Sequence, residues 1–138
     1  MITQGQTTSF KKELYTATHD FTIDTFKIAL YTANATLDQD TTAYTATGEI
    51  TGTGYTAGGK TLINPVVNAS DGTAYISFNN ISWPTSSFTV RGALIYNSSK
   101  ANRSIAVLDF GSDKTTASTF TITFPVNTAT SALIRSSN

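Results

Sequence analysis

The sequence predicts a mainly β protein, a single-domain antiparallel β-sandwich of the Ig-like or jelly-roll-like kind with one short N-terminal helix. Thr accounts for 27 of the 138 residues and aromatic residues for 11%, and both residue types favour strands. Short apolar segments alternate with turn-forming segments along the chain, which is typical of a sandwich. A chain of this length normally forms one domain, so we assign residues 1–138 to a single unit.

We expect the centre of the main sheet at two apolar runs, Arg91–Tyr96 and Ser104–Phe110. Each run has the length of a strand and is apolar at nearly every position, as in a strand that is covered on both faces. The segment between them, 97–103, is polar and turn-forming. The two runs therefore predict an antiparallel hairpin whose loop is longer than two residues.

The N-terminal part predicts an extended arm over residues 1–6 and the one helix over residues 7–18. The sandwich then occupies residues 20–135. One face of the helix would carry three apolar residues at helical spacing: Phe10, Leu14 and Ala17.

Further strands are predicted from alternation and from turn signals. Segment 20–32 alternates, and one of its faces would direct three side chains to the core: Phe26, Ile28 and Leu30. Segments 61–68 and 73–79 flank Asp71-Gly72, which is a strong signal for a hairpin turn. Pro65 lies in the first of these strands and predicts an edge or a bulge there. The last two strands are expected at 120–124 and 132–135.

Two irregular segments interrupt this pattern. Segment 33–48 is polar and predicts a long surface loop anchored by Leu37 and Tyr44, with a helical turn at 40–44. Segment 48–59 holds five of the nine glycines and predicts a sharply bent strand or loop.

The charge balance argues against several classes of partner. Nine basic and nine acidic residues give a net charge of zero, which provides little support for nucleic-acid binding. No apolar run is long enough to predict a membrane span. The N-terminus lacks the basic and apolar regions of a signal peptide, so we expect the chain to be made in the cytoplasm and not secreted.

One stretch, Gly54–Thr61, matches the phosphate-loop pattern GxxxxGK[ST]. A true phosphate loop follows a buried strand and begins a helix, whose N-terminus faces the phosphates. Here Leu62–Pro65 follows, which is a strand pattern that ends in a helix breaker. We therefore interpret the stretch as a glycine-rich bend and expect no bound nucleotide.

Other candidates for chemistry are equally weak. Asp38, Asp40 and Glu49 fall at positions of a helix–loop–helix calcium loop, but the other ligand positions and the flanking helices are missing. His19, the only histidine, is expected to cap the end of the helix, where the dipole favours an imidazolium. Asp109 is expected to lie in a turn. We therefore assign no catalytic, cofactor-binding or metal-binding residue and expect no enzymatic activity.

Aromatic and apolar residues near the irregular segments are candidates for a contact surface. Trp83 and the tyrosines could form an interface patch or a sugar platform, whereas packing in the core and at its rim is the simpler interpretation. We name five candidate interface residues: Ile2, Phe10, Tyr44, Tyr55 and Trp83. The arm 1–6, the loop 33–48 and the glycine segment 52–59 are the candidate contact elements.

Five stretches together resemble a family of small structural proteins of tailed bacteriophages. They are His19–Tyr31, Gly52–Gly59, Arg91–Asn97, Ala106–Gly111 and Phe120–Pro125. The similarity extends from about Ile2 to Arg135 and includes no catalytic signature.

This resemblance implies a virion component that is present in many copies. The character of the chain is similar to that of capsid decoration, or cement, proteins. The implied partners are the major capsid protein and neighbouring copies of the chain itself, and the implied location is the virion. The alternative within the same resemblance is a tail or baseplate module that contacts tail proteins or a receptor on the host surface.

Overall fold

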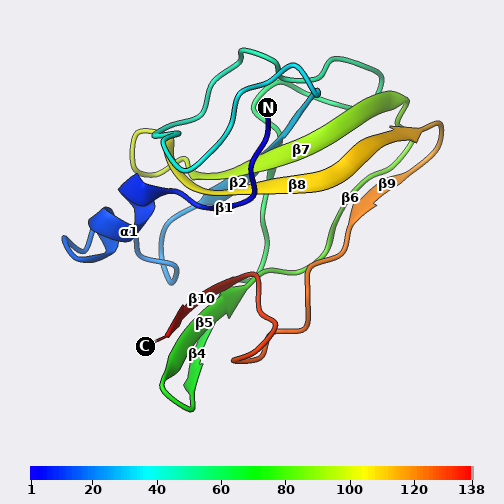
Figure 1. Cartoon of the computed structure of the whole chain (residues 1–138). Helices are drawn as coiled ribbons and strands as arrows, with labels where there is room; N and C mark the ends of the chain where they lie inside the picture. Colours follow the sequence, from blue (N-terminus) through cyan, green and yellow to red (C-terminus); the bar gives the residue numbers. More distant parts are fainter. Residues whose placement is uncertain (138) are drawn as a thin grey trace.

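The computed structural model describes residues 1–137 and confirms a mainly β fold with one short helix near the N-terminus (Figure 1). The strands form several antiparallel sheets. In chain order the elements are β1 (Gly5–Gln6), α1 (Thr8–Leu14), β2 (Phe26–Tyr31), β3 (Lys60–Thr61), β4 (Val66–Ser70), β5 (Thr73–Ser77), β6 (Ile81–Trp83), β7 (Phe88–Asn97), β8 (Arg103–Thr116), β9 (Phe120–Ile122) and β10 (Ile134–Ser137).

The larger layer is a five-stranded sheet with the order β1-β8-β7-β2-β3. Its centre is the predicted hairpin of β7 and β8, in which Ala93 pairs with Leu108 and Leu94 with Val107. Strand β2 pairs with the other side of β7. The prediction of a central hairpin with a long loop is therefore confirmed.

The second layer consists of a three-stranded sheet, β10-β5-β4, and a two-stranded sheet, β6-β9. Figure 1 shows β4, β5 and β10 below the five-stranded sheet, at the opposite end of the molecule from the loops above β7. Asp71 and Gly72 join β4 to β5 with φ of 52° and 77°. Positive φ at both central residues defines a type I′ turn, which is the turn that this dipeptide predicts.

The main core lies between the two layers. Strands β2, β7 and β8 supply residues from one side, and β5, β6, β9 and β10 supply residues from the other. The predicted inward face of β2 is confirmed, because Phe26, Ile28 and Leu30 are all buried.

A second cluster explains why the central strands are apolar on both faces. Tyr31, Leu94 and Val107 point to the outer face of the five-stranded sheet and are covered there by residues that include Leu37. Leu37 is fully buried, and the ring of Tyr44 stacks on that of Tyr96 with centroids 5.0 Å apart. Both predicted anchors of the loop 33–48 are thus confirmed.

The expected helical turn at 40–44 is wrong. Ala43 instead forms a β-bridge with Arg103, and the amide of Tyr44 donates to the carbonyl of Asn102 at 2.9 Å. The backbone of this part of the loop bonds to the β7–β8 hairpin. The internal turn of the loop lies earlier, where the amide of Thr41 donates to the carbonyl of Asp38 at 3.1 Å.

The helix is shorter than the predicted span 7–18. Thr7 is the N-cap, and its side-chain oxygen accepts a hydrogen bond from the amide of Phe10. The helix ends at Leu14, and Ala17 adopts a φ of 55° that no helix continues through. Of the predicted apolar stripe, Phe10 alone is buried, whereas Leu14 is 41% exposed.

The N-terminal arm is bound to the sheet. Ile2 forms a parallel bridge with Leu37, and Gly5 and Gln6 pair with β8 as strand β1. The expectation of an extended segment is correct, but backbone pairing fixes it to its own chain. Across residues 1–137, no helix is both long enough and apolar enough to cross a membrane.

Candidate functional site

Three of the five candidate interface residues are core residues. Ile2, Phe10 and Trp83 have exposed fractions of 7%, 1% and 2%. The ring of Phe10 packs against that of His19 with centroids 5.3 Å apart, and the ring of Trp83 packs against that of Phe120 with centroids 5.9 Å apart. These three side chains are therefore enclosed by their own chain and are not part of its exposed surface. Burying their apolar area stabilises the fold.

The other two candidates, Tyr44 and Tyr55, meet at Glu49. The hydroxyl of Tyr44 donates to Oε1 of Glu49 at 2.7 Å, and that of Tyr55 donates to Oε2 at 2.5 Å. The amide of Gly58 donates to the same Oε2 at 2.8 Å. The Tyr55 hydroxyl also accepts a hydrogen bond from the amide of Leu30. Glu49 thus ties the glycine segment and the loop 33–48 to β2.

Burial and the Glu49 carboxylate both disfavour ionised tyrosine here. Burial, followed by the hydrogen bond to Glu49, raises the pKa of Tyr44 to about 12. The same causes, in the same order, raise the pKa of Tyr55 further. Both hydroxyls therefore stay protonated near neutral pH and act as donors. Within the chain these hydroxyls close the loops, and both side chains are half-buried. Their part in an interface stays a prediction.

Segment 48–59 needs glycine at two positions, Gly48 and Gly59, because its backbone approaches other parts of the chain closely there. At Gly59, φ is +81° and an added Cβ would lie 1.8 Å from the carbonyl oxygen of Ile28. At Gly48, an added Cβ would lie 2.7 Å from the Cβ of Ala35. The bend predicted for 48–59 is confirmed, and its glycines allow this close contact as well as positive φ.

The phosphate-loop pattern lies in this same bend. Its last residues, Lys60 and Thr61, form strand β3 and pair with β2. The amino group of Lys60 lies 5.7 Å from the ring centroid of Trp83 and donates to the carbonyl of Ser82. A strand therefore stands where a phosphate loop requires a helix.

His19 lies in a buried polar cluster and not at an exposed helix end. Its Nε2 is 2.8 Å from Oε1 of Glu13, and its Nδ1 is 3.0 Å from Nδ2 of Asn97. Asn97 also donates to Asp24, which forms an ion pair with Lys100 at 3.0 Å. Because both ring nitrogens of His19 face these partners, the cluster joins α1, the segment before β2 and the β7–β8 loop. We assign it a structural role.

Hydrogen bonds within this cluster favour the ionised form of Asp24. Burial alone would raise the pKa of Asp24, but hydrogen bonds from the Asp20 amide, from Asn97 and from Lys100 outweigh it and hold that pKa below its usual range. The remaining acidic candidates lie apart from one another. Glu49 faces the tyrosines. Asp109 lies within β8 opposite Gly92, not in the expected turn, and pairs with Arg91. No group of three metal-ligating side chains occurs within residues 1–137.

Strand β4 is exposed along its whole length. All five of its residues are exposed, and it contains no charged side chain. Val67 is 52% exposed, and Ile63 just before the strand is 63% exposed. The sequence indicated this strand as half of a hairpin, and Pro65 indicated an edge or a bulge. The structure confirms an edge, because β4 is the last strand of its sheet.

Backbone hydrogen-bonding groups of β4 face away from its own sheet. Strand β4 pairs with β5 on one side, and no other strand among residues 1–137 pairs with it. The two residues that flank a two-residue turn bond to each other through their backbones. Beyond them, non-hydrogen-bonded and hydrogen-bonded residue pairs alternate along the two strands. Given the register from Ser70 opposite Thr73, Asn68 bonds towards β5, while the backbone groups of Val67 and Ala69 point outward. We call these outward groups the β4 edge.

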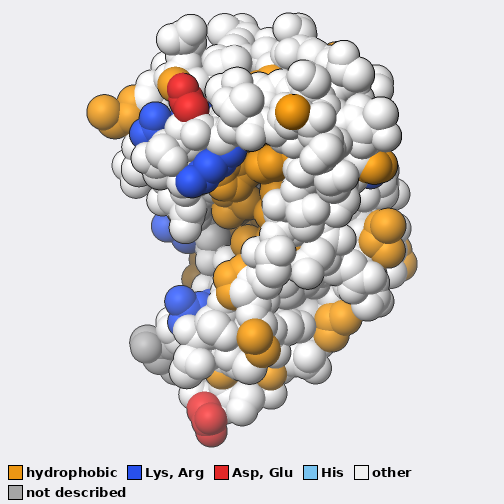
Figure 2. Space-filling view, turned by 90° about the vertical axis from the view of Figure 1, so that its right-hand side faces the viewer, with side chains coloured by type: hydrophobic (Ala, Val, Ile, Leu, Met, Phe, Trp, Pro, Cys, Tyr) orange, Lys and Arg blue, Asp and Glu red, His pale blue; other side chains and the backbone are white. Residues whose placement is uncertain are grey.

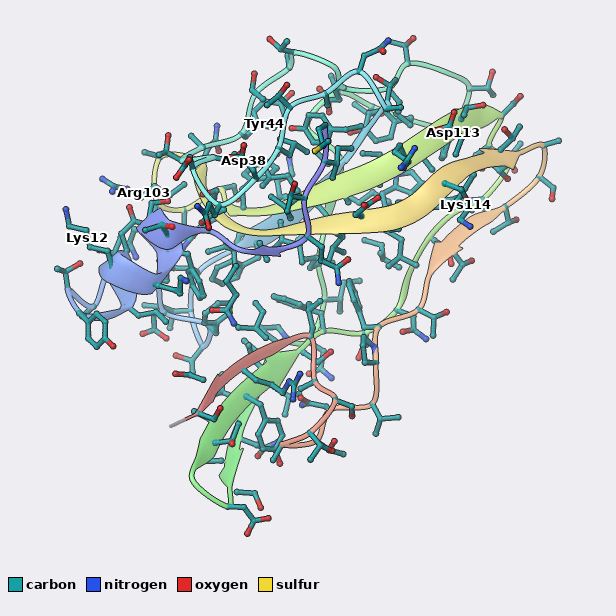
Figure 3. The ribbon with its side chains drawn as sticks, in the orientation of Figure 1. Lys12, Asp38, Tyr44, Arg103, Asp113 and Lys114 are labelled. Atoms are coloured by element: carbon teal, nitrogen blue, oxygen red, sulfur yellow. The ribbon has the colours of Figure 1, made fainter. Side chains whose placement is uncertain are left out.

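Strand β8 also has an open side, but charges protect it. Strand β1 covers only Ala106 and Val107. Further along β8, the side chains of Asp113 and Lys114 lie near the far end of the β7–β8 ribbon (Figure 3). Charged residues discourage pairing at a sheet edge. The β4 edge lacks this protection and is therefore the better candidate for contact with another chain.

The space between the two layers is partly open at the surface. Figure 2 shows a hollow between the upper and lower parts of the molecule, with hydrophobic side chains visible inside it. A groove of about 660 Å³ runs between β1 and β8 on one side and the C-terminal segments on the other. Leu108 and Phe110 of β8 form part of its wall.

Comparisons of the chain with protein-family models, with curated proteins and with solved structures found no match. The resemblance to structural proteins of tailed bacteriophages therefore stays a prediction.

Proposed function

We propose that the protein is a non-enzymatic structural component of a tailed-bacteriophage virion, and that it acts as a capsid decoration protein. Its partners are the major capsid protein and neighbouring copies of itself. Its site of action is the assembled particle. In this role the chain adds contacts between subunits and performs no chemistry.

The observation that carries this proposal is the β4 edge. An exposed, uncharged edge strand is a template for pairing with another strand, and proteins that stay monomeric usually protect such an edge. Val67 and Ala69 offer outward backbone groups, and Val66, 38% exposed, adds apolar area beside them. Strand addition of this kind gains affinity from main-chain hydrogen bonds and specificity from flanking side chains.

The closed loops make the rest of the chain a suitable support for such a contact. The Glu49 cluster fixes the glycine segment, and the His19 cluster fixes the β7–β8 loop. A rigid partner loses little conformational entropy on binding. Each copy that binds the assembled shell and not its separate subunits stabilises the shell by mass action.

The copy number per particle tests the proposed role. Quantitative mass spectrometry of purified particles would measure it before and after mild heating. A decoration protein is expected in hundreds of copies that are released as the shell weakens. A dozen or fewer copies that remain with isolated tails would refute the capsid role in favour of a tail or receptor-binding module. Absence from the particle would refute the virion assignment altogether.

A pair of proline variants tests the contact surface. Ala69→Pro removes an outward N–H of the β4 edge and leaves the bonds to β5 in place. It should therefore abolish binding to the particle while the chain still folds. Asn68→Pro removes an inward N–H and should instead destabilise the β4–β5 hairpin. If Ala69→Pro binds particles as well as the unaltered chain, the β4 edge is not the contact.

A further inference from the structure

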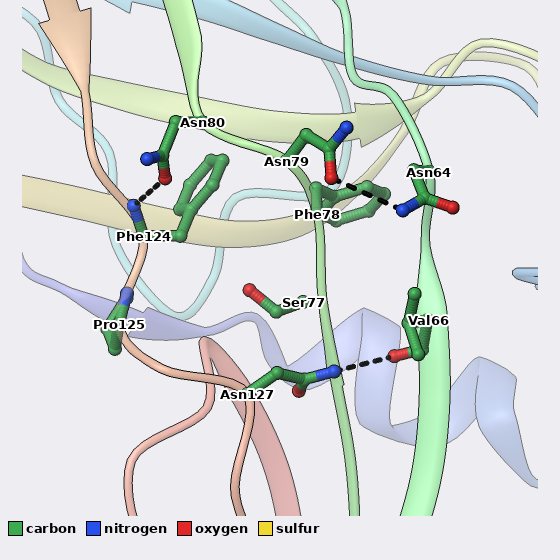
Figure 4. Close-up of a pocket in the computed structure, with 9 residues that line it drawn as sticks. All are labelled: Asn64, Val66, Ser77, Phe78, Asn79, Asn80, Phe124, Pro125 and Asn127. Atoms are coloured by element: carbon green, nitrogen blue, oxygen red, sulfur yellow. Dashed lines mark hydrogen bonds between the residues drawn. The ribbon is translucent and has the colours of Figure 1, made fainter.

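A second surface feature is a cavity of about 410 Å³. It lies at the end of the three-stranded sheet opposite the Asp71-Gly72 turn. We call it the asparagine cavity. It is bounded by the start of β4, the end of β5 and the segment after β9 (Figure 4). Its lining contains polar and apolar side chains and no charged one: Asn64, Val66, Ser77, Phe78, Asn79, Asn80, Phe124, Pro125 and Asn127.

Two buried polar atoms in this lining have no hydrogen-bond partner. Within residues 1–137, the buried side-chain atoms without a partner are Oγ of Ser77, Oδ1 of Asn127 and Nε1 of Trp83, and the first two belong to the cavity. Ser77 is only 5% exposed, and Figure 4 shows its hydroxyl directed into the space beside Asn127 and Pro125. Leaving such atoms unpaired costs free energy, so their concentration at one cavity indicates a place for a bound polar molecule.

The side-chain amides of the neighbouring asparagines are fixed by hydrogen bonds at some of their atoms, and their other polar atoms remain available to a ligand. Nδ2 of Asn64 donates to Oδ1 of Asn79 at 3.3 Å, which leaves the Asn79 amino group and the Asn64 carbonyl for other partners. Oδ1 of Asn80 accepts from the amide of Phe124 at 2.9 Å, which leaves its amino group. Nδ2 of Asn127 donates to the carbonyl of Val66 at 3.3 Å. The cavity therefore offers both donors and acceptors in fixed positions.

This combination selects a class of ligand. The lining has no carboxylate to bind a cation and no Lys or Arg to bind a phosphate or an acidic group. Amides and a hydroxyl pair well with groups that donate and accept at once, such as sugar hydroxyls. Phe78, Phe124 and Pro125 supply apolar walls for the C–H faces of a ring. We propose that the asparagine cavity binds a neutral saccharide, with Ser77 and Asn127 bonding its hydroxyls.

The volume limits the size of this ligand. Ligand sites in proteins measure roughly 300–1,000 Å³, so this cavity is near the lower end of that range. It would hold the end of a glycan or a short saccharide and not a length of polymer. The site is separate from the outward groups of the β4 edge, and its test does not depend on the particle.

Side-chain amide signals give a direct test. A ¹⁵N-labelled full chain would be titrated with glucose, galactose, N-acetylglucosamine and lactose, and with methyl glucuronide as a charged probe. At least one neutral sugar should shift the side-chain NH₂ signals of the four cavity asparagines in a saturable way. Methyl glucuronide should bind more weakly, since its carboxylate would lose water without gaining a cation.

Two variants assign the binding to the cavity. Ser77→Ala removes an unpaired hydroxyl, so the fold should be kept while affinity falls about 5- to 10-fold, the loss expected for one hydrogen bond. Asn127→Leu should also weaken binding. Asn68→Ala, on the exposed face of β4, is the matched control and should leave the affinity unchanged.

Three outcomes would overturn the proposal. The cavity holds only water if no neutral sugar shifts these signals at concentrations up to about 50 mM, a range that would detect even millimolar affinity. Equal affinity in the Ser77→Ala and Asn127→Leu variants places the binding elsewhere. Equal affinity for methyl glucuronide contradicts selection for a neutral ligand.

Discussion

Two glycine-to-alanine variants with nearly the same backbone angle separate backbone strain from close packing. Gly59 has φ of +81° and Gly111 has φ of +80°. An added Cβ at Gly111 would meet no atom within 4 Å, whereas at Gly59 it would lie 1.8 Å from the carbonyl oxygen of Ile28. The two sites thus share the strain of a left-handed conformation, and only Gly59 has the steric conflict.

The expected magnitudes follow from these two terms. The left-handed conformation costs about 1–2 kcal/mol for a residue with a Cβ, which is the whole effect expected for Gly111→Ala. Gly59→Ala adds about 1–3 kcal/mol for displacing packed groups. That displacement would move β3 away from β2 and expose Leu62, which is 5% exposed in the intact chain. We therefore expect Gly59→Ala to lower the free energy of unfolding by about 2–5 kcal/mol in total.

Urea unfolding followed by tryptophan fluorescence measures both variants. Trp83 is the only tryptophan and is 2% exposed, so its emission reports loss of the core. The free energy of unfolding of Gly59→Ala should lie clearly below that of Gly111→Ala. Equal losses in the two variants would refute the close approach of the glycine segment to β2.

Three further predictions concern the polar clusters. Tyr55→Phe should lower the free energy of unfolding by about 2–3 kcal/mol and Tyr44→Phe by about 1 kcal/mol, because Tyr55 makes two hydrogen bonds through its hydroxyl and Tyr44 makes one; equal losses in urea unfolding would contradict this. The raised pKa values mean that an unfolded tyrosine, with pKa near 10, loses its proton before the folded one does. The stability that these tyrosines contribute should therefore be fully present below about pH 10 and decrease as the pH rises towards the folded pKa of about 12 for Tyr44. A thermal midpoint that stays constant over this interval would contradict this prediction. Asn97→Ala removes contacts to His19, Asp24 and the Ser99 amide, and should cost about 2–4 kcal/mol; a loss below about 1 kcal/mol would show that this cluster does not fix the loop.

Local patterns in the sequence predicted many of the strands, but not the continuation of β8 through Asp109 to Thr116, where a turn was expected. The apolar runs around Leu94 and Val107, the alternation at Phe26–Leu30 and the Asp71-Gly72 turn each indicate a strand or a turn from adjacent residues alone. These features depend on side-chain period and turn chemistry, which are local properties. The fold class followed from them correctly.

The candidate contact residues were harder to predict, because exposure depends on contacts between distant segments. Trp83 and Phe10 are large aromatic residues, and the sequence does not say whether such residues face the core or a partner. Glu49 was considered only as a calcium ligand, since its bonds to Tyr44 and Tyr55 form when two loops meet. Pro65 indicated an edge or a bulge near β4, but the exposed, uncharged open side follows from the strand order of the whole sheet.

The central claim is that the β4 edge forms the contact within a virion. Hydrogen exchange at the backbone amides of Val67, Asn68 and Ala69 tests it most directly, compared between the isolated chain and particles that carry the protein. The amides of Val67 and Ala69 should exchange quickly in the isolated chain and become protected in the particle, while Asn68 is protected in both. Equally fast exchange of Val67 and Ala69 in both states would contradict the claim.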